Sequence, residues 1–160
     1  MNGKTVYLDS SAIVKRYVAE RGTEAIDRLY HRAEAGRLTL AFSLWNVGEV
    51  LGAFIRARRL GSLSDRQLGR IAASFLGETL KERGLGNLRV VPVRGDLLAG
   101  TVPLLLRHPL SQPDGLQIVT CRAIEAEALV SADERLLRAA GAEGLHALHP
   151  EDDTEELDRL

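Results

Sequence analysis

Short apolar runs alternate with longer segments of helical periodicity along nearly the whole chain. The runs are only a few residues long, which suits buried strands, and the segments between them repeat apolar residues every three or four positions. Strands separated by helices pair in parallel, because a crossover helix returns the chain to the same end of the sheet. The pattern therefore predicts an α/β fold, in which helices cover both faces of a parallel sheet.

Element bounds follow from these runs and from local signals. We expect strands at residues 5–8, 38–42, 88–93, 128–131 and 145–148, and helices at residues 11–19, 23–33, 43–60, 64–80, 96–107, 111–126 and 133–140. Ser64, with Gln67 three residues later, is typical of a capping box at the start of a helix. Pro103 should kink or delay the helix at 96–107, because proline cannot donate a backbone hydrogen bond.

Length and charge suggest how the chain is divided. Its 160 residues suit one domain, which we expect at residues 1–150. Residues 151–160 carry six acidic side chains against one arginine, so we expect an acidic, disordered tail there. The first 150 residues carry 20 basic and 16 acidic side chains, which permits a polyanionic partner without requiring one.

Several classes of protein are disfavoured by composition. No apolar stretch approaches the ~20 residues of a transmembrane helix, and the run at 5–8 is too short for a signal-peptide core. We therefore expect a cytoplasmic protein with no membrane partner. Cys121 is the single cysteine, so we expect no internal disulfide and no zinc site. We expect it to be a small packing residue rather than a nucleophile.

Acidic residues stand near the ends of the expected strands. Asp9 directly follows the first strand and Asp133 follows the fourth, while Glu49 and Asp114 lie in helices 43–60 and 111–126. Parallel sheets bind ligands just beyond the carboxyl ends of their strands. Four carboxylates gathered there would repel one another, and a divalent cation such as Mg²⁺ resolves that conflict. Such a site suits phosphodiester hydrolysis by metal-activated water.

Each acid also has an ordinary structural explanation. Asp9 and Asp133 can cap the helices that follow them. Asp114 can complete a capping box with Ser111. Glu49 lies across its helix from the apolar residues and can be an exposed surface side chain. Spacing alone leaves both interpretations open.

Four short motifs resemble those of PIN-domain proteins, especially the VapC-like toxins. They read YLDSSAIVK at 7–15, FS and GEVL at 42–43 and 48–51, RHPL and PDGLQI at 107–110 and 113–118, and LVSADERLL at 129–137. The resemblance spans roughly residues 4–150, with the motifs in the expected order. The third motif departs from the usual pattern, with Gly115 and Gln117 where alanine and histidine are more common, and this bears on substrate preference.

The resemblance implies a PIN-like three-layer fold, with a parallel sheet of about five strands in the order 3-2-1-4-5 flanked by helices. It also implies an endoribonuclease toxin that depends on Mg²⁺ or Mn²⁺, forms a homodimer and is restrained by a VapB-like antitoxin. Ser10 or Ser11 would support the site. Carried over by position, the residues for catalysis and metal binding are Asp9, Glu49, Asp114 and Asp133.

Candidate RNA contacts lie near the acidic elements. Lys15, Arg16 and Arg56 are basic and lie within one or two helical turns of them, so we expect phosphate contacts there. Trp45 shares a helical face with Glu49 and Arg56. It either stacks on a base or packs against a neighbouring helix or a dimer partner.

Wide apolar stripes on helices 23–33 and 64–80 have two interpretations. They either face the core or a homodimer, or they leave a groove for an amphipathic antitoxin helix. Other functions are also open: an RNA-processing PIN nuclease without an antitoxin, or a PIN-like module that binds RNA or protein without cutting. A phosphoacceptor domain or a haloacid-dehalogenase-type phosphatase fits less well, since the latter needs an aspartate where Ser11 stands.

Overall fold

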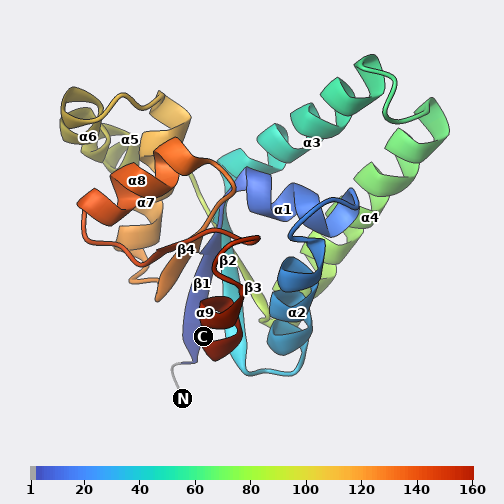
Figure 1. Ribbon diagram of the computed structural model, residues 1–160, viewed down its shortest axis with the longest axis horizontal. Helices are drawn as coiled ribbons and strands as arrows, with labels where there is room; N and C mark the ends of the chain where they lie inside the picture. The colour runs from blue at the N-terminus through green and yellow to red at the C-terminus, as the bar shows by residue number, and fades with distance from the viewer. Residues whose placement is uncertain (1–2) are drawn as a thin grey trace.

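One parallel sheet organises the computed structural model, which describes residues 3–160 (Figure 1). Within these residues the sheet has five strands in the order β3-β2-β1-β4-β5, so the predicted order is confirmed. Central β1 pairs with β2 and β4, and every pairing is parallel. The strands are β1 (Lys4–Leu8), β2 (Leu38–Ser43), β3 (Leu88–Val91), β4 (Ala128–Val130) and β5 (Ala147–Leu148).

Helices cover both faces of the sheet. In Figure 1, α1 to α4 lie on one side of it and α5 to α8 on the other. The helices are α1 (Ser10–Tyr17), α2 (Thr23–Glu34), α3 (Leu44–Arg59), α4 (Asp65–Leu85), α5 (Gly95–Gly100), α6 (Val102–Arg107), α7 (Gln112–Ala123), α8 (Glu134–Ala142) and α9 (Thr154–Arg159). None of them, over residues 3–160, is long and apolar enough to cross a lipid bilayer.

Two hydrophobic cores explain why β1 is apolar along its buried length. Val6 and Leu8 point into the core shared with α1, α2, α3 and α4. Tyr7 points the other way, into the core formed with α6, α7 and α8. Successive side chains of a strand face opposite sides of the sheet, so a strand covered on both faces has no solvent-facing position.

The segment at 95–107 is interrupted, as Pro103 predicted. It forms two short helices, α5 and α6, with proline in the first turn of α6. Gly115 lets α7 approach this break closely, because a Cβ at that position would lie 3.2 Å from the Cβ of Thr101. The glycine that departs from the family pattern therefore has a packing role.

The expectation of a disordered acidic tail differs from the structure. Residues 154–159 form α9, whose Leu157 is buried in the same core as α2, and Leu160 is 7% exposed. Arg28 on α2 pairs with Asp158 at 2.8 Å. Counting charges missed these two leucines, one within α9 and the other directly after it.

The apolar stripes have different surroundings. On α2 the stripe at 25–33 is buried, so it belongs to the core. On α4, Phe75 is buried, while Leu76 and Leu80 are 40% and 68% exposed. Helices α3 and α4 form an antiparallel arm that projects from the body (Figure 1). The outer face of α4 is thus only partly buried by the rest of the chain.

Candidate active site

A cleft of about 400 Å³ lies at the carboxyl ends of the strands. The four predicted acids line it together with both serines and Arg56, so the fold brings these side chains to one place. Its lining residues are Asp9, Ser10, Ser11, Val14, Glu49, Gly52, Ala53, Arg56, Asp114 and Asp133. In residues 3–160, no three acidic, histidine or cysteine side chains already stand in an arrangement that holds a metal ion.

Asp9 is held by two serine hydroxyls. It follows β1 and caps α1, and its Oδ2 accepts hydrogen bonds from Ser11 Oγ at 2.8 Å and Ser131 Oγ at 2.9 Å. Burial raises the pKa of Asp9, and the hydrogen bonds from Ser11 and Ser131 oppose that rise. These bonds stabilise the ionised carboxylate in a site that otherwise disfavours charge.

The two serine hydroxyls also hold the loop that carries Asp133. Ser11 Oγ accepts the N–H of Ala132 at 2.8 Å, and Ser131 Oγ accepts the N–H of Asp133 at 3.0 Å. Each hydroxyl has one proton, which is directed to Asp9. Sequence reasoning did not select Ser131, although its place two residues before Asp133 at the end of β4 was the available signal.

Glu49 is supported by the other serine. Ser10 Oγ donates to Glu49 Oε2 at 2.6 Å, so Ser11 supports Asp9 while Ser10 supports Glu49. Burial raises the pKa of Glu49, the charges of Asp9 and Asp114 add to that rise, and the Ser10 hydrogen bond opposes it. Glu49 is therefore half-buried beside like charges rather than an ordinary surface glutamate.

Asp114 and Asp133 perform the capping roles that their positions suggested. Asp114 Oδ2 accepts Ser111 Oγ at 2.7 Å and forms the capping box of α7. Asp133 Oδ1 accepts the N–H groups of Arg135 and Leu136 at the start of α8. Capping did not exclude a place in the cleft, because each side chain caps with only one of its oxygens.

The same division holds for all four carboxylates. Within residues 3–160, every hydrogen bond to these groups falls on a single oxygen of each. No hydrogen bond of 3.5 Å or less reaches the other oxygen from this part of the chain; these atoms are Asp9 Oδ1, Glu49 Oε1, Asp114 Oδ1 and Asp133 Oδ2. The Trp45 side chain lies near enough to Glu49 to oppose the rise in its pKa. Helices α1, α7 and α8 begin at the cleft, and their N-terminal dipoles favour the negative charge.

Two of the predicted RNA contacts are corrected by the structure. The Lys15 side chain is 5% exposed and donates to the Arg21 carbonyl and to Glu151. Arg16 pairs with Asp27 and Glu78, both at 2.8 Å. These contacts hold the last turn of α1 against neighbouring parts of the chain. Neither cation lines the cleft.

The remaining two candidates are accessible. Arg56 lines the cleft, is exposed, and forms no ion pair with the residues at 3–160. Trp45 is 45% exposed near the start of α3 and is not among the lining residues of the cleft. Two fully buried polar side chains behind Glu49, Asn46 and Gln117, were not selected as site residues from the sequence.

Comparison with known proteins gives a family. The family model described as PIN domain matches residues 6–142. No curated protein matches the chain.

Solved structures with a similar fold span almost the whole chain. VapC20 of Mycobacterium tuberculosis, described as a sarcin-ricin loop cleaving toxin, is 19% identical, with a TM-score of 0.61 over 88% of this chain and 95% of that one. FitAcB of Neisseria gonorrhoeae is 12% identical, with a TM-score of 0.66 over 91% and 97%. A toxin-antitoxin complex from Klebsiella pneumoniae is 16% identical, with a TM-score of 0.57 over 91% and 97%. At these identities the likeness concerns the fold.

Proposed function

Because the chain belongs to the PIN-domain family, we propose that it is a metal-dependent endoribonuclease. RNA is the proposed substrate, and the cleft lined by Asp9, Glu49, Asp114 and Asp133 is the proposed site of phosphodiester hydrolysis. Mg²⁺ is the proposed ion, with Mn²⁺ as a substitute, and the four acids are the proposed ligands.

The observation that carries this proposal is the free oxygen on each of the four carboxylates. Carboxylate oxygens are the donors that Mg²⁺ and Mn²⁺ prefer. In residues 3–160, the one cationic side chain within 4.0 Å of these carboxylates is Arg135, which lies 4.0 Å from Asp133 Oδ1. The donor set fits a divalent ion, since the four negative charges otherwise have little compensation.

The chain's own residues orient the site. A divalent ion held by the four acids would supply an activated water and positive charge for phosphodiester hydrolysis. Ser11 and Ser131 fix one oxygen of Asp9 by hydrogen bonds and leave the other without a hydrogen bond. Ser10 does the same for Glu49, and Arg56 on the cleft wall attracts the phosphodiester backbone.

A protein partner is part of the proposal. A similar solved structure is described as a toxin-antitoxin complex. We infer that this chain is a VapC-like toxin that acts in the cytoplasm, forms a homodimer and is restrained by a VapB-like antitoxin. The exposed Leu76 and Leu80 on α4 offer apolar area for a partner.

Co-expression with the neighbouring small reading frame tests the partner. The toxin should slow growth alone, co-purify with that partner and lose ribonuclease activity in the complex. Active enzyme that is harmless when expressed and has no co-purifying partner would favour an RNA-processing nuclease. A chain that binds RNA without cleaving it would favour the binding module.

Asp9→Asn tests the metal and the chemistry. Wild-type protein should bind Mn²⁺ in isothermal titration and cleave single-stranded or looped RNA to 5′-phosphate and 3′-hydroxyl ends. Asp9→Asn should largely abolish Mn²⁺ binding. It should also raise the activation free energy of cleavage by several kcal/mol, which slows cleavage roughly 100-fold or more. Asp96→Asn is the matched control, since Asp96 pairs with Arg94 outside the cleft.

Two outcomes would contradict the proposal. Unchanged Mn²⁺ binding in Asp9→Asn would remove Asp9 from the ligand set. A 2′,3′-cyclic phosphate product would indicate attack by the ribose hydroxyl rather than by water.

A further inference from the structure

Three polar side chains lie buried behind Glu49, on the side away from the cleft. Asn46 and Tyr7 are 0% exposed and Gln117 is 1% exposed. They come from α3, β1 and α7, so the fold brings them together from three elements. Burying polar groups is costly unless hydrogen bonds satisfy them, so the direction of each bond shows what the group does.

The Asn46 amide has one possible orientation. Its Oδ1 accepts the backbone N–H of Ser43 at 2.9 Å, and a backbone N–H can only donate. The Nδ2 group therefore points to Ser10 Oγ at 2.7 Å and toward Glu49 Oε2 at 3.4 Å. Because the Ser10 hydroxyl accepts from Asn46, its proton is directed to Glu49 Oε2, at 2.6 Å.

Gln117 is oriented by a similar argument. The Tyr7 hydroxyl accepts the N–H of Ser43 at 3.2 Å and donates to Gln117 Oε1 at 2.7 Å, with Asn46 Oδ1 a more distant acceptor at 3.4 Å. The amide nitrogen of Gln117 then faces Glu49 Oε2 at 3.5 Å. A flipped Gln117 amide would instead place its oxygen against the Glu49 carboxylate. The Ser43 N–H thus orients Asn46 directly and helps to orient Gln117 through the Tyr7 hydroxyl.

We propose that Asn46 and Gln117 are positioning residues for Glu49, with Asn46 acting through the Ser10 hydroxyl. They present only donors to Glu49 Oε2, which holds that oxygen toward the interior and leaves Oε1 for the cleft. Asn46 makes the shorter contacts and is the main positioning residue. This inference rests on the proposed metal-dependent function, because it gives Glu49 a ligand role to be positioned for.

Asn46 also has a purely structural role, which the test must separate. It is the third residue of α3 and forms a capping box with Ser43. Ser43→Ala is the matched control. It removes the hydroxyl that accepts the N–H of Trp45 and leaves the backbone N–H of Ser43 that orients Asn46.

Mn²⁺ titration of Asn46→Ala and Ser43→Ala, with thermal unfolding alongside, tests the inference. Both variants should lose thermal stability, because each removes half of the capping box. Asn46→Ala alone should weaken Mn²⁺ binding by about 10-fold or more, the usual range for residues that orient metal ligands. Equal Mn²⁺ affinities in the two variants would reduce Asn46 to a helix cap and overturn the inference.

A double-mutant cycle then tests the path through Ser10. Ser10→Ala and Asn46→Ala together should weaken Mn²⁺ binding less than the two single effects combined, because they interrupt the same contact. Full additivity would overturn the role of Ser10. Methionine is uncharged and similar in length to glutamine. Gln117→Met should therefore weaken Mn²⁺ binding less than Asn46→Ala does, because the contact from Gln117 to Glu49 is long, at 3.5 Å.

Failure of the proposed function looks different from failure of this inference. Wild-type protein that binds no Mn²⁺ would overturn the proposed function and this inference together. Wild-type protein that binds Mn²⁺, with Asn46→Ala equal to Ser43→Ala, would overturn only the positioning roles.

Discussion

At the scale of single residues, the same carboxylate can both cap a helix and border the cleft. Asp114 and Asp133 cap helices through one oxygen and border the cleft, and Asp9 divides its oxygens in the same way. An ionised carboxylate has two acceptor oxygens, so a capping role and a ligand role are compatible. Capping also favours a ligand role, because a hydrogen bond to one oxygen restricts the rotation of the whole carboxylate group.

Gly115 permits a residue-scale prediction about packing. Replacing glycine by alanine inside a helix normally gains up to about 1 kcal/mol. At Gly115, however, the new Cβ would meet Thr101, which is fully buried and held by two hydrogen bonds through its hydroxyl. Overpacking costs about 1–3 kcal/mol, so Gly115→Ala should lower the free energy of unfolding by about 1 kcal/mol.

Urea unfolding checks this prediction against a second glycine. A Cβ at Gly77 on α4 would meet nothing within 4 Å, so Gly77→Ala should stabilise the protein by up to about 1 kcal/mol. Equal stabilisation by Gly115→Ala would show that α7 can move away from Thr101.

At the scale of elements, packing decides which segments order. α9 is rich in acidic residues, yet Leu157 is 1% exposed and packs with α2. Burial of two leucines stabilises a helix too short to persist alone, because isolated helices under about 12 residues are marginal in water. By contrast with α9, the outer part of the α3–α4 arm consists mostly of exposed or half-buried side chains.

Leu157→Ala tests the packing of α9. It should lower the free energy of unfolding by about 2–5 kcal/mol, the usual cost of truncating a buried leucine. Leu106→Ala is the control, because Leu106 is 84% exposed and its truncation should change stability by less than about 0.5 kcal/mol. An unfolding curve for Leu157→Ala that matches wild type would indicate that α9 contributes no stability.

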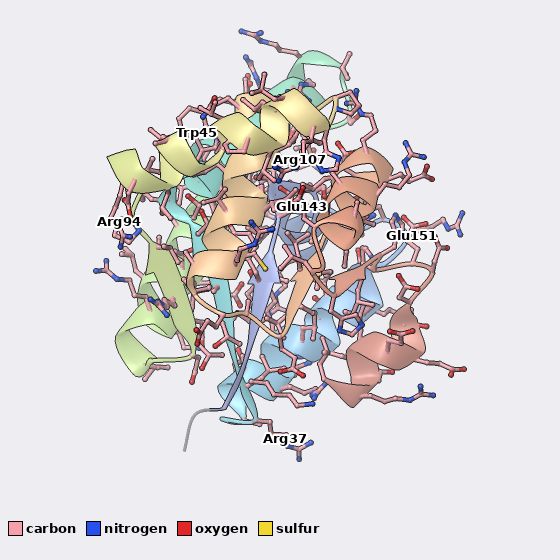
Figure 2. All side chains as sticks on the ribbon, turned by 90° about the vertical axis from the view of Figure 1, so that its left-hand side faces the viewer. Arg37, Trp45, Arg94, Arg107, Glu143 and Glu151 are labelled. Atoms are coloured by element: carbon pink, nitrogen blue, oxygen red, sulfur yellow. The ribbon has the colours of Figure 1, made fainter. Side chains whose placement is uncertain are left out.

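Glu143 joins three helices and predicts a dependence on pH. Its carboxylate, at the end of α8, contacts Arg107 and His108 from the end of α6 and Arg122 from the end of α7. Figure 2 shows Arg107 beside Glu143. Hydrogen bonds from His108 and Arg107 lower the pKa of Glu143 to about 2. The stability from this cluster is present above the ordinary carboxyl pKa of about 4.5 and is lost as the pH falls toward 2.

Glu143→Gln measures that contribution. The variant should unfold at a lower temperature than wild type at pH 7, and the difference between the two should shrink as the pH falls from about 4.5 toward about 2. Melting temperatures measured across that interval check the prediction. A difference that stays constant with pH would mean that the charge of Glu143 is not what stabilises the cluster.

At the scale of the whole molecule, charge is unevenly distributed. Residues 50–77, on the α3–α4 arm, carry five arginines and one aspartate, a net charge of +4, while the whole chain carries −1. Arg58 pairs with Asp65, and Arg56 lies on the wall of the acidic cleft. A basic arm beside an acidic cleft would attract a polyanion toward the proposed metal site without placing cations on the four acids.

Salt dependence of RNA binding tests the arm. In the Asp9→Asn background, Arg56→Ala and Arg59→Ala should each make the log–log salt slope of single-strand binding shallower by about 0.7. Arg37→Ala is the control, because Arg37 lies at the other end of the molecule from Trp45 on α3 (Figure 2). Unchanged slopes in both arm variants would remove the arm from the RNA-binding surface.

The sequence by itself determined the fold class and the interruption at Pro103, and it offered the caps at Asp114 and Asp133 as one of two open interpretations. These features depend on periodicity and on neighbours within about four residues. The strand order came from the resemblance of four motifs, and the acidic quartet came from positions near the strand ends and from the same motifs. The structure has that strand order and gathers the four acids at one cleft, and their role as metal ligands stays a prediction.

Only the tertiary structure decided how individual side chains are used. Lys15 looked free, but it is buried against Glu151, which is 136 residues away in the chain. The division of Ser10 and Ser11 between Glu49 and Asp9 likewise depends on how α1 meets α3. Such pairings are set by the packing of distant elements, and local sequence patterns carry no record of which distant group will satisfy a polar atom.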